Sequence, residues 1–178
     1  MFEEEISLKN QEVVFVSLIK TKDNYIFSAV TKTGEIVGKC VFEICTLEVI
    51  PFKNGQDKFL LKEKNEFNGN ISSKIVNLDF LKANNIKVNS KINICKLNQI
   101  EISNEKFFKV GLGTTLVKRM EKFAISKNCN EIYGWFYPNG NFWHGASTFY
   151  SKNGFSFKKD ENNMTIITKN ISKVNVKE

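Results

Sequence analysis

The amino-acid sequence predicts an α+β fold, and three observations support this fold class. β-rich runs separated by short turns fill residues 13–50. A strongly amphipathic helical pattern starts at residue 112. Strand-like and helix-like segments then alternate to the end of the chain. We expect one domain over residues 1–178, because a chain of this length with 42% hydrophobic residues can bury one sizeable core.

The first fifty residues have the pattern of an antiparallel meander. Two β-rich runs, VVFVSLI (13–19) and YIFSAVT (25–31), are separated by a turn-like KTKDN, and a third run continues after Thr33-Gly34 as far as Ile50. Residues 51–90 are atypical. They contain turn-rich stretches around two short elements, KFLLKE and KIVNLDFL, and the pattern leaves the type of both elements open.

The next strand, residues 92–102, carries apolar residues on both faces, which is typical of a buried strand. Its alternation predicts Cys95 and Leu97 on one face and four isoleucines on the other: Ile92, Ile94, Ile100 and Ile102. From Leu112 to Ala124 the apolar residues recur at helical spacing, and Asn128 is the expected C-terminal stop of this helix.

The last quarter of the chain alternates between strands and one short helix. EIYGWFY (131–137) predicts a strand, and GASTFYSK (145–152) predicts a helix that Asn153-Gly154 closes. FSFKK (155–159) and MTIITKNI (164–171) predict a final pair of strands.

Charge and composition restrict the function classes. The formal net charge of +7 favours anionic partners such as phosphate-bearing molecules. Arg119 is the only arginine among 26 basic residues, so sequence-specific DNA binding, which relies on arginine, is disfavoured. The chain has no run of eighteen uncharged apolar residues and starts without an apolar leader, so we expect a cytoplasmic protein without a membrane segment.

The cysteines do not predict a metal site. Cys40, Cys45, Cys95 and Cys129 form no Cys-x-x-Cys pair, and the chain contains a single histidine. Buried, reduced thiols are the expected state of all four.

The motif with the clearest chemical meaning is KVGLG (109–113), which places two glycines at the start of the predicted helix. The N-terminus of a helix exposes unpaired N–H groups and carries a partial positive charge, so it can bind an anion. A dinucleotide-binding motif needs a third glycine where Leu116 stands, and a Walker loop needs Gly-Lys-Ser/Thr. A shorter phosphate-binding loop between strand and helix fits the residues, although the glycines could also serve only to form the turn.

Two segments together resemble the GNAT acetyltransferase superfamily. Residues 109–133 resemble its pyrophosphate loop, Gln/Arg-x-x-Gly-x-Gly/Ala, and the helix and strand that follow. The later family segment, Ala-x-x-Phe-Tyr-x-Lys-x-Gly-Phe, is matched here by Ala146, Phe149, Tyr150, Lys152, Gly154 and Phe155. The resemblance covers residues 92–160 well and residues 25–50 loosely. It implies a GNAT-like mixed, largely antiparallel central sheet flanked by helices, with an atypical segment at 51–90.

The resemblance also implies an activity: transfer of an acetyl group from acetyl-CoA to an amine by direct attack in a ternary complex. Acetyl-CoA would lie between the strand that ends at Ile102 and the strand from Glu131, and its pantetheine arm would pair with the backbone of Ile100 and Ile102. The residues implied at the pyrophosphate are Lys109, Val110, Gly111, Leu112, Gly113 and Thr114. Asn139 and Asn141 would contact the cofactor or hold a turn.

The implied chemistry needs an acid for the leaving thiolate and a base for the amine. Tyr150 stands where the family often has its acid, although it could also only pack at the helix end. Glu101 is the candidate base. His144 is more simply a structural or solvent-facing residue, and the neighbouring aromatic residues 142–143 could line an acceptor pocket or cover the core.

Two departures from the family pattern keep alternatives open. Phe108 stands where the family has a polar residue, and Lys106 or Lys109 could replace that contact. Only a short turn separates Ile19 from Tyr25, where the family inserts two helices, so the acceptor side must be built otherwise, with residues 51–90 as the candidate. The alternatives are a non-catalytic CoA-binding or regulatory domain and a basic nucleic-acid-binding module. The partners expected are acetyl-CoA and an unidentified amine, for a monomer or a homodimer.

Overall fold

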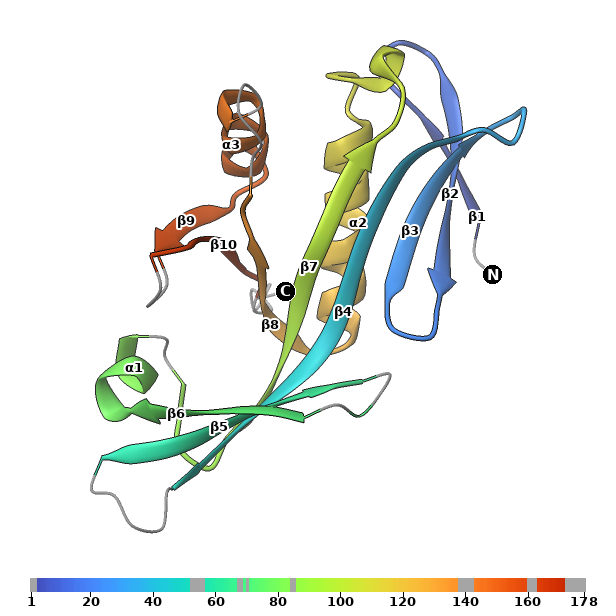
Figure 1. The fold of residues 1–178 in the computed structure, drawn as a ribbon. Helices are drawn as coiled ribbons and strands as arrows, with labels where there is room; N and C mark the ends of the chain where they lie inside the picture. Colours follow the sequence, from blue (N-terminus) through green and yellow to red (C-terminus); the bar gives the residue numbers. More distant parts are fainter. Residues whose placement is uncertain are drawn as a thin grey trace, which may run out of the picture.

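The computed structural model describes residues 3–51, 57–66, 69, 71–83, 86–137, 143–159 and 163–171. Its strands form one ten-stranded sheet in the order β1-β2-β3-β4-β7-β8-β10-β9, and β5 and β6 extend from β4 (Figure 1). Every described pairing is antiparallel except β7 with β8. The predicted α+β class, with a mixed and largely antiparallel sheet and flanking helices, is confirmed.

The predicted meander is present and starts one strand earlier than the sequence indicated. The strands are β1 (Glu3–Ser7), β2 (Val13–Lys20), β3 (Tyr25–Thr31) and β4 (Ile36–Pro51). β1 was not predicted because its sequence, EEEIS, is acidic. A tight turn joins β2 to β3, in which the N–H of Thr21 donates to the carbonyl of Asn24 at 2.9 Å. No helix therefore lies between these two strands.

β4 is 16 residues long and takes part in two sub-assemblies. Its first half pairs with β3, and its second half, from Cys45 to Pro51, pairs with β5 (Lys58–Asn65). β5 forms a hairpin with β6 (Ile71–Asn77), and α1 (Leu78–Ala83) follows directly. Figure 1 shows this hairpin running across the ends of β4 and β7. KFLLKE, whose type the sequence left open, is thus part of a strand, and KIVNLDFL forms the junction between β6 and α1. These elements surround a small core of Val49, Leu61, Val76 and Leu81.

β7 (Lys91–Ile102) corrects one sequence prediction. Phe42 pairs with Leu97 and Val41 pairs with Gln99, so Asn98 is an extra residue that forms a β-bulge. The bulge reverses the alternation, and Ile100 and Ile102 therefore share the face of Cys95 and Leu97. The prediction of all four isoleucines on one face was wrong, because it assumed uninterrupted alternation.

The remaining elements follow the prediction closely, except for one short 3-10 helix that the sequence did not predict. They are the short 3-10 helix η1 (Glu105–Phe107), α2 (Leu112–Ser126), β8 (Cys129–Trp135), α3 (Trp143–Lys152), β9 (Ser156–Lys159) and β10 (Thr165–Asn170). α2 ends as predicted, because Asn128 adopts the left-handed conformation with φ 57°. Gly154, with φ 79°, closes α3 in the same way.

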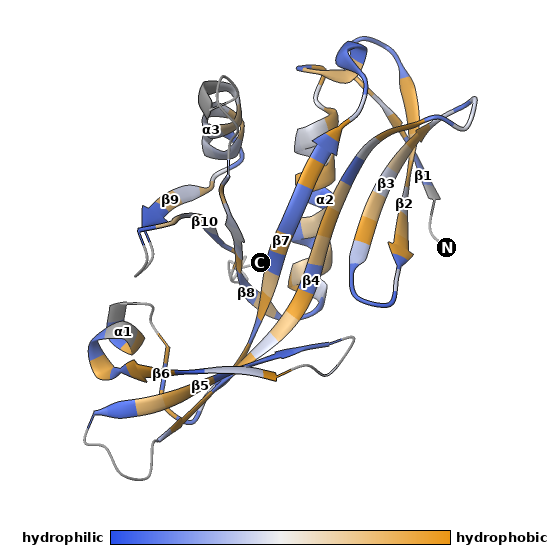
Figure 2. Ribbon diagram, viewed as in Figure 1, coloured by the Kyte–Doolittle hydropathy of each residue, from blue (hydrophilic) through white to orange (hydrophobic). Residues whose placement is uncertain are grey.

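The main core lies between α2 and the sheet. Leu112, Leu116, Val117, Met120 and Ala124 of α2 are buried, as the helical spacing predicted. Hydrophobic residues run along β2, β3 and β4 in Figure 2, and these strands supply the facing side chains. All four cysteines are buried free thiols. Within the described residues, no group of three His, Cys, Asp or Glu side chains could hold a metal ion, and no helix is long and apolar enough to span a membrane.

Candidate functional site

The feature that organises the site is the separation of two parallel strands. β7 and β8 pair only from Asn93 to Leu97 of β7, and the last pair is Leu97 with Gly134. Beyond this pair, residues 99–102 of β7 remain paired with β4 alone, and β8 continues beside β10. Figure 1 shows the two strands diverging from this point. We call this separation the split, and the pair of Leu97 with Gly134 is its vertex.

Gly134 allows the strands to approach closely at the vertex. A Cβ atom at this position would lie 2.6 Å from the carbonyl oxygen of Leu97, which is closer than real Cβ contacts. The bulge at Asn98 follows the vertex directly on β7. The pairing of β7 with β8 therefore stops where Gly134 of β8 lies very close to β7 and where β7 contains an extra residue.

The open edge of β7 presents backbone groups to the split. The N–H of Ser103 donates to the carbonyl of Val37 on β4 at 3.0 Å. Because hydrogen-bonded and non-hydrogen-bonded residues alternate along an antiparallel ladder, the N–H and C=O groups of Ile100 and Ile102 point away from β4. An extended ligand could pair with them as an added strand does. Their side chains pack against the main core.

The start of α2 is an uncapped helix N-terminus. Gly111 is the N-cap residue, with φ 100°, and it makes no side-chain capping hydrogen bond. The first helical bond runs from the N–H of Thr115 to the carbonyl of Gly111 at 2.9 Å. Within the described residues, the N–H groups of Leu112, Gly113 and Thr114 have no hydrogen-bond partner, and the first turn contains no acidic residue. These donors are suited to an anion.

The two loop glycines have different structural roles. Gly111 needs its left-handed conformation, and no atom lies within 4 Å of a Cβ placed on it. A Cβ on Gly113 would lie 2.9 Å from Cε2 of Phe149 on α3. Gly113 therefore lets α3 pack against the first turn of α2, in addition to its predicted place in the phosphate-binding loop.

The lysines of the loop also differ. Lys106 forms an ion pair with Glu12, with Nζ 3.3 Å from Oε1, and its Nζ lies 5.1 Å from the centre of the Phe107 ring. Lys109 has φ 59° and is exposed immediately before the helix. Lys109 is thus the better placed of the two to replace the polar residue missing at Phe108, whose side chain is 48% exposed.

Tyr150, which belongs to α3, lies in a cluster of aromatic rings. Its ring contacts Phe136, Phe149 and Phe155, with ring centres 5.2–5.7 Å apart. Burial, and then the neighbouring Cys40 thiol, raise the pKa of Tyr150 to about 12. Cys40 is the sheet partner of Ile100, and Ile100 and Tyr150 both pack against the main core to which Cys40 belongs. Tyr150 is thus a packed residue whose phenol stays protonated at neutral pH.

Glu101 lies on the opposite face of the sheet from α2. Its Oε2 is 2.9 Å from Nζ of Lys39 and accepts a hydrogen bond from Nε2 of Gln99 at 2.8 Å. The carboxylate is therefore beside the split but already paired with a cation. Asn139, Asn141 and residue 142 lie outside the described residues, as do the side chains at 143 and 144.

A charged network that the sequence did not indicate lies one residue from the vertex, on the face of Glu101. Its members are Glu43, Glu63, Asn65, Lys96 and Tyr133, and we call it the Glu63 network. They come from four strands, β4, β5, β7 and β8. Strand pairing places Glu43 and Tyr133 beside Lys96, and the packing of the β5–β6 hairpin adds Glu63 and Asn65 to them.

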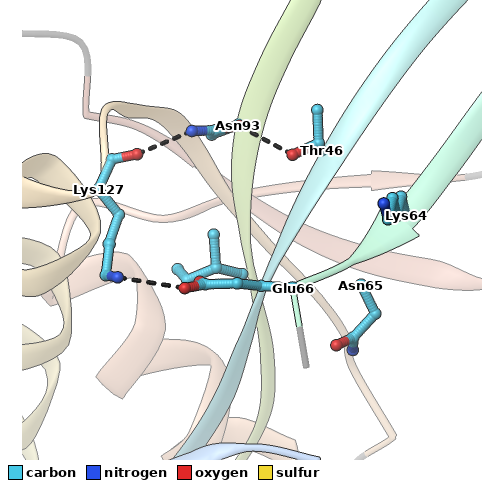
Figure 3. A pocket seen from close by; sticks show the side chains of 7 residues that line it. Thr46, Lys64, Asn65, Glu66, Asn93 and Lys127 are labelled. Atoms are coloured by element: carbon cyan, nitrogen blue, oxygen red, sulfur yellow. Dashed lines mark hydrogen bonds and ion pairs between the residues drawn. The ribbon is translucent and has the colours of Figure 1, made fainter. Parts of the chain in front are cut away.

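A separate cleft lies at the other end of α2, and Figure 3 shows it. It encloses about 330 Å³, and Lys127 bridges it through an ion pair with Glu66 at 3.2 Å. Asn93 donates to the carbonyl of Lys127 at 2.9 Å and accepts from Thr46 at 3.0 Å. These bonds fix the C-terminal end of α2 to β7. The cleft contains none of the predicted site residues.

No protein-family model matches this chain, and no curated protein sequence matches it. Solved structures do. Several of them are GNAT-family acetyltransferases. One is a GNAT-family acetyltransferase from Staphylococcus aureus, with 13% identity and a TM-score of 0.48, over 85% of this chain and 70% of that one.

Two further structures show the same range of similarity. A GNAT-family acetyltransferase from Listeria monocytogenes has 14% identity and a TM-score of 0.44, over 82% of this chain. The PaiA N-acetyltransferase from Thermoplasma acidophilum, in complex with coenzyme A, has 16% identity and a TM-score of 0.44, over 83% of this chain. This chain spans 63% and 61% of these two proteins, respectively.

Proposed function

We propose that this chain is an N-acetyltransferase that moves an acetyl group from acetyl-CoA to an amine by direct attack in a ternary complex. Residues 1–178 act as a single acyltransferase-like domain in this proposal. The observation that carries it is that the open edge of β7 leads directly to the uncapped start of α2. A Cβ on Gly38 would lie 3.1 Å from both Ile102 of β7 and Leu112 of α2, so the two elements meet there.

The donor would occupy this path from one end to the other. Its pyrophosphate would accept hydrogen bonds from the first-turn N–H groups of α2, with Lys109 as a nearby cation. Its pantetheine arm would pair with Ile100 and Ile102. Residues 98–102 span about 13 Å at about 3.3 Å per residue, and this length brings the thioester toward the vertex.

The chemistry would then use the phenol of Tyr150. The neutral amine attacks the thioester carbon and forms the C–N bond, and the C–S bond of the tetrahedral intermediate breaks. Tyr150 gives its proton to the departing thiolate, and the proton lost by the nitrogen restores the phenol. This role needs a protonated phenol, and Tyr150, whose pKa burial raises to about 12, is protonated throughout the neutral range.

A second candidate is a domain that binds CoA without catalysis. It is favoured by Phe108, which leaves the loop without the polar side chain that the GNAT motif has at this position. Sustained acetylation of any amine by the purified chain excludes this candidate.

Isothermal titration calorimetry with acetyl-CoA tests the proposed donor site. The test variant is Gly111→Ala, which strains the loop because Gly111 has φ 100°. The matched control is Gly34→Ala, because Gly34 has φ 86° with no atom within 4 Å of a Cβ, and lies in the turn between β3 and β4. Both substitutions cost about 1–2 kcal/mol of backbone strain.

We expect the wild type and Gly34→Ala to bind acetyl-CoA with similar affinity, and Gly111→Ala to bind at least about tenfold more weakly, a loss of about 1.4 kcal/mol. Equal weakening by both substitutions would mean that strain alone acts on binding. Absence of binding by the wild type at millimolar acetyl-CoA would overturn the proposal.

A further inference from the structure

The Glu63 network lies one residue from the vertex of the split. Lys96 and Tyr133 form the pair that precedes Leu97 and Gly134, at a distance of about 3.3 Å along the strands. Leu97 points into the core, so Lys96 points to the opposite face of the sheet. If acetyl-CoA occupies the open edge of β7, as proposed above, this network lies beside its thioester.

Glu63 connects the two strands at this point. Its Oε1 accepts a hydrogen bond from the Tyr133 hydroxyl at 3.3 Å and lies 3.7 Å from Nζ of Lys96. The side chain of Glu63 is 28% exposed, so a ligand can reach it. Glu63 comes from β5, so the hairpin of residues 58–77 supplies this carboxylate.

The network carries an excess of negative charge. Lys96 is also paired with Glu43, with Nζ 3.3 Å from Oε1, and Asn65 donates to the other oxygen of Glu43. Two carboxylates therefore face one ammonium group. Burial raises the pKa of the Tyr133 phenol, and that of the Cys45 thiol beside Glu63, so both stay neutral. In the ion pairs described for this network, carboxylates outnumber ammonium groups by one, and this excess would attract a cation.

Glu101, the candidate base from the sequence, differs from Glu63 both in the balance of charge around it and in its distance from the vertex. It is paired with Lys39 at 2.9 Å, so one carboxylate faces one ammonium group there. It also lies beyond the bulge, toward the far end of β7, whereas the Glu63 network adjoins the vertex. Charge and position both favour the Glu63 network as the acceptor side.

We propose that Glu63 receives the acceptor and that the acceptor is an aliphatic primary amine, which arrives as an ammonium ion. The ammonium ion binds at the excess negative charge and transfers one proton to the carboxylate of Glu63. The resulting neutral amine attacks the thioester carbon, and Glu63 releases its proton to solvent. Glu63 and Tyr150 thus act from opposite faces of the sheet.

Two acceptors distinguish a proton acceptor from a structural ion pair. n-Butylamine is an ammonium ion at pH 7 and needs a base, whereas 4-methoxyaniline is already neutral. We expect Glu63→Gln to lower kcat/KM for n-butylamine by about 100-fold or more, with little change for 4-methoxyaniline. The deficit should shrink toward about pH 9.5, because an alkylammonium of pKa about 10.4 then supplies its own free base.

Two further variants control the experiment. Glu48→Gln removes a carboxylate of β4 that pairs with Lys91 at 3.5 Å, away from the vertex, and should leave both acceptors unaffected. Glu63→Asp keeps the charge but shortens the side chain, and should lower the rate for n-butylamine alone. It serves as the test variant if Glu63→Gln does not fold.

Equal losses for the two acceptors, a deficit that does not change with pH, or no transfer to n-butylamine by the wild type would each overturn the proposal. Calorimetry with acetyl-CoA on the same samples reports on the donor site separately. Binding of acetyl-CoA together with any of these results leaves the proposed donor site standing and removes only the role of Glu63.

Discussion

Phe149 of α3 packs against Gly113 of α2 so closely that a Cβ at residue 113 would lie 2.9 Å from the phenylalanine ring. The contact joins the first turn of α2, which follows β7, to the helix that follows β8. Tyr150 is the next residue along α3, and its ring touches that of Phe149. The position of Tyr150 therefore depends on a glycine in the first turn of α2.

Gly113→Ala should lower the free energy of unfolding by about 1–3 kcal/mol, because the methyl group must displace a packed ring. It should also weaken acetyl-CoA binding. Urea denaturation and calorimetry measure the two effects. The control is Gly145→Ala in α3, where no atom lies within 4 Å of a Cβ. That substitution should be neutral or stabilising by up to about 1 kcal/mol. Recovery of stability when Phe149→Leu is added to Gly113→Ala would identify the contact as the cause.

Gly134→Ala should be more damaging. Its Cβ would lie 2.6 Å from a backbone oxygen, that of Leu97, which cannot move aside as a side chain does. We expect a loss of about 3 kcal/mol or more, measured by thermal denaturation followed by circular dichroism. A melting temperature equal to that of the wild type would contradict the close approach of β7 and β8 at the vertex.

Tyr150→Phe tests the acid role. The substitution keeps the ring contacts with Phe136 and Phe155 and removes only the proton. We expect kcat to fall by about 100-fold, with the KM for acetyl-CoA nearly unchanged. An unchanged kcat would mean that Tyr150 only packs, and it would leave the proposed acetyl-CoA site uncontradicted.

Alkaline pH should reveal the burial of Tyr150 in the stability of the chain. Its pKa is near 10 in the unfolded chain and is raised to about 12 in the folded one. Above pH 10 the phenol of Tyr150 loses its proton in the unfolded chain before it does so in the folded one. The contribution of Tyr150 to the free energy of unfolding therefore declines as the pH rises from about 10 to about 12. Denaturation at several pH values should show a shallower decline for Tyr150→Phe than for the wild type. Parallel declines would mean that other groups, such as the buried Tyr133, account for the effect.

The sequence was sufficient where local patterns determine structure. The stripe from Leu112 to Ala124, the stop at Asn128 and the closing Gly154 all appear where the pattern placed them. The sequence also predicted part of the arrangement of the residues proposed to bind acetyl-CoA, because Ile100, Ile102 and the start of α2 adjoin the same split. Their roles as ligands remain predictions.

The features that the sequence did not indicate depend on contacts between distant segments. The acidic β1 is a strand because it pairs with β2. The Glu63 network forms only when the β5–β6 hairpin packs over β7 and β8. The steric role of Gly113 required knowing where Phe149 lies, 36 residues further along the chain. No local pattern contains such information.

The extra residue at Asn98 makes strand length a constraint of its own. Deleting Asn98 itself would leave a regular ladder in which Ile100 and Ile102 keep their places on the core face, whereas deleting Ile100 would turn Glu101 inward and Ile102 out toward water. Substitutions along residues 98–102 can be absorbed one by one, but the loss or gain of one residue between Gln99 and Ile102 turns the end of this strand inside out.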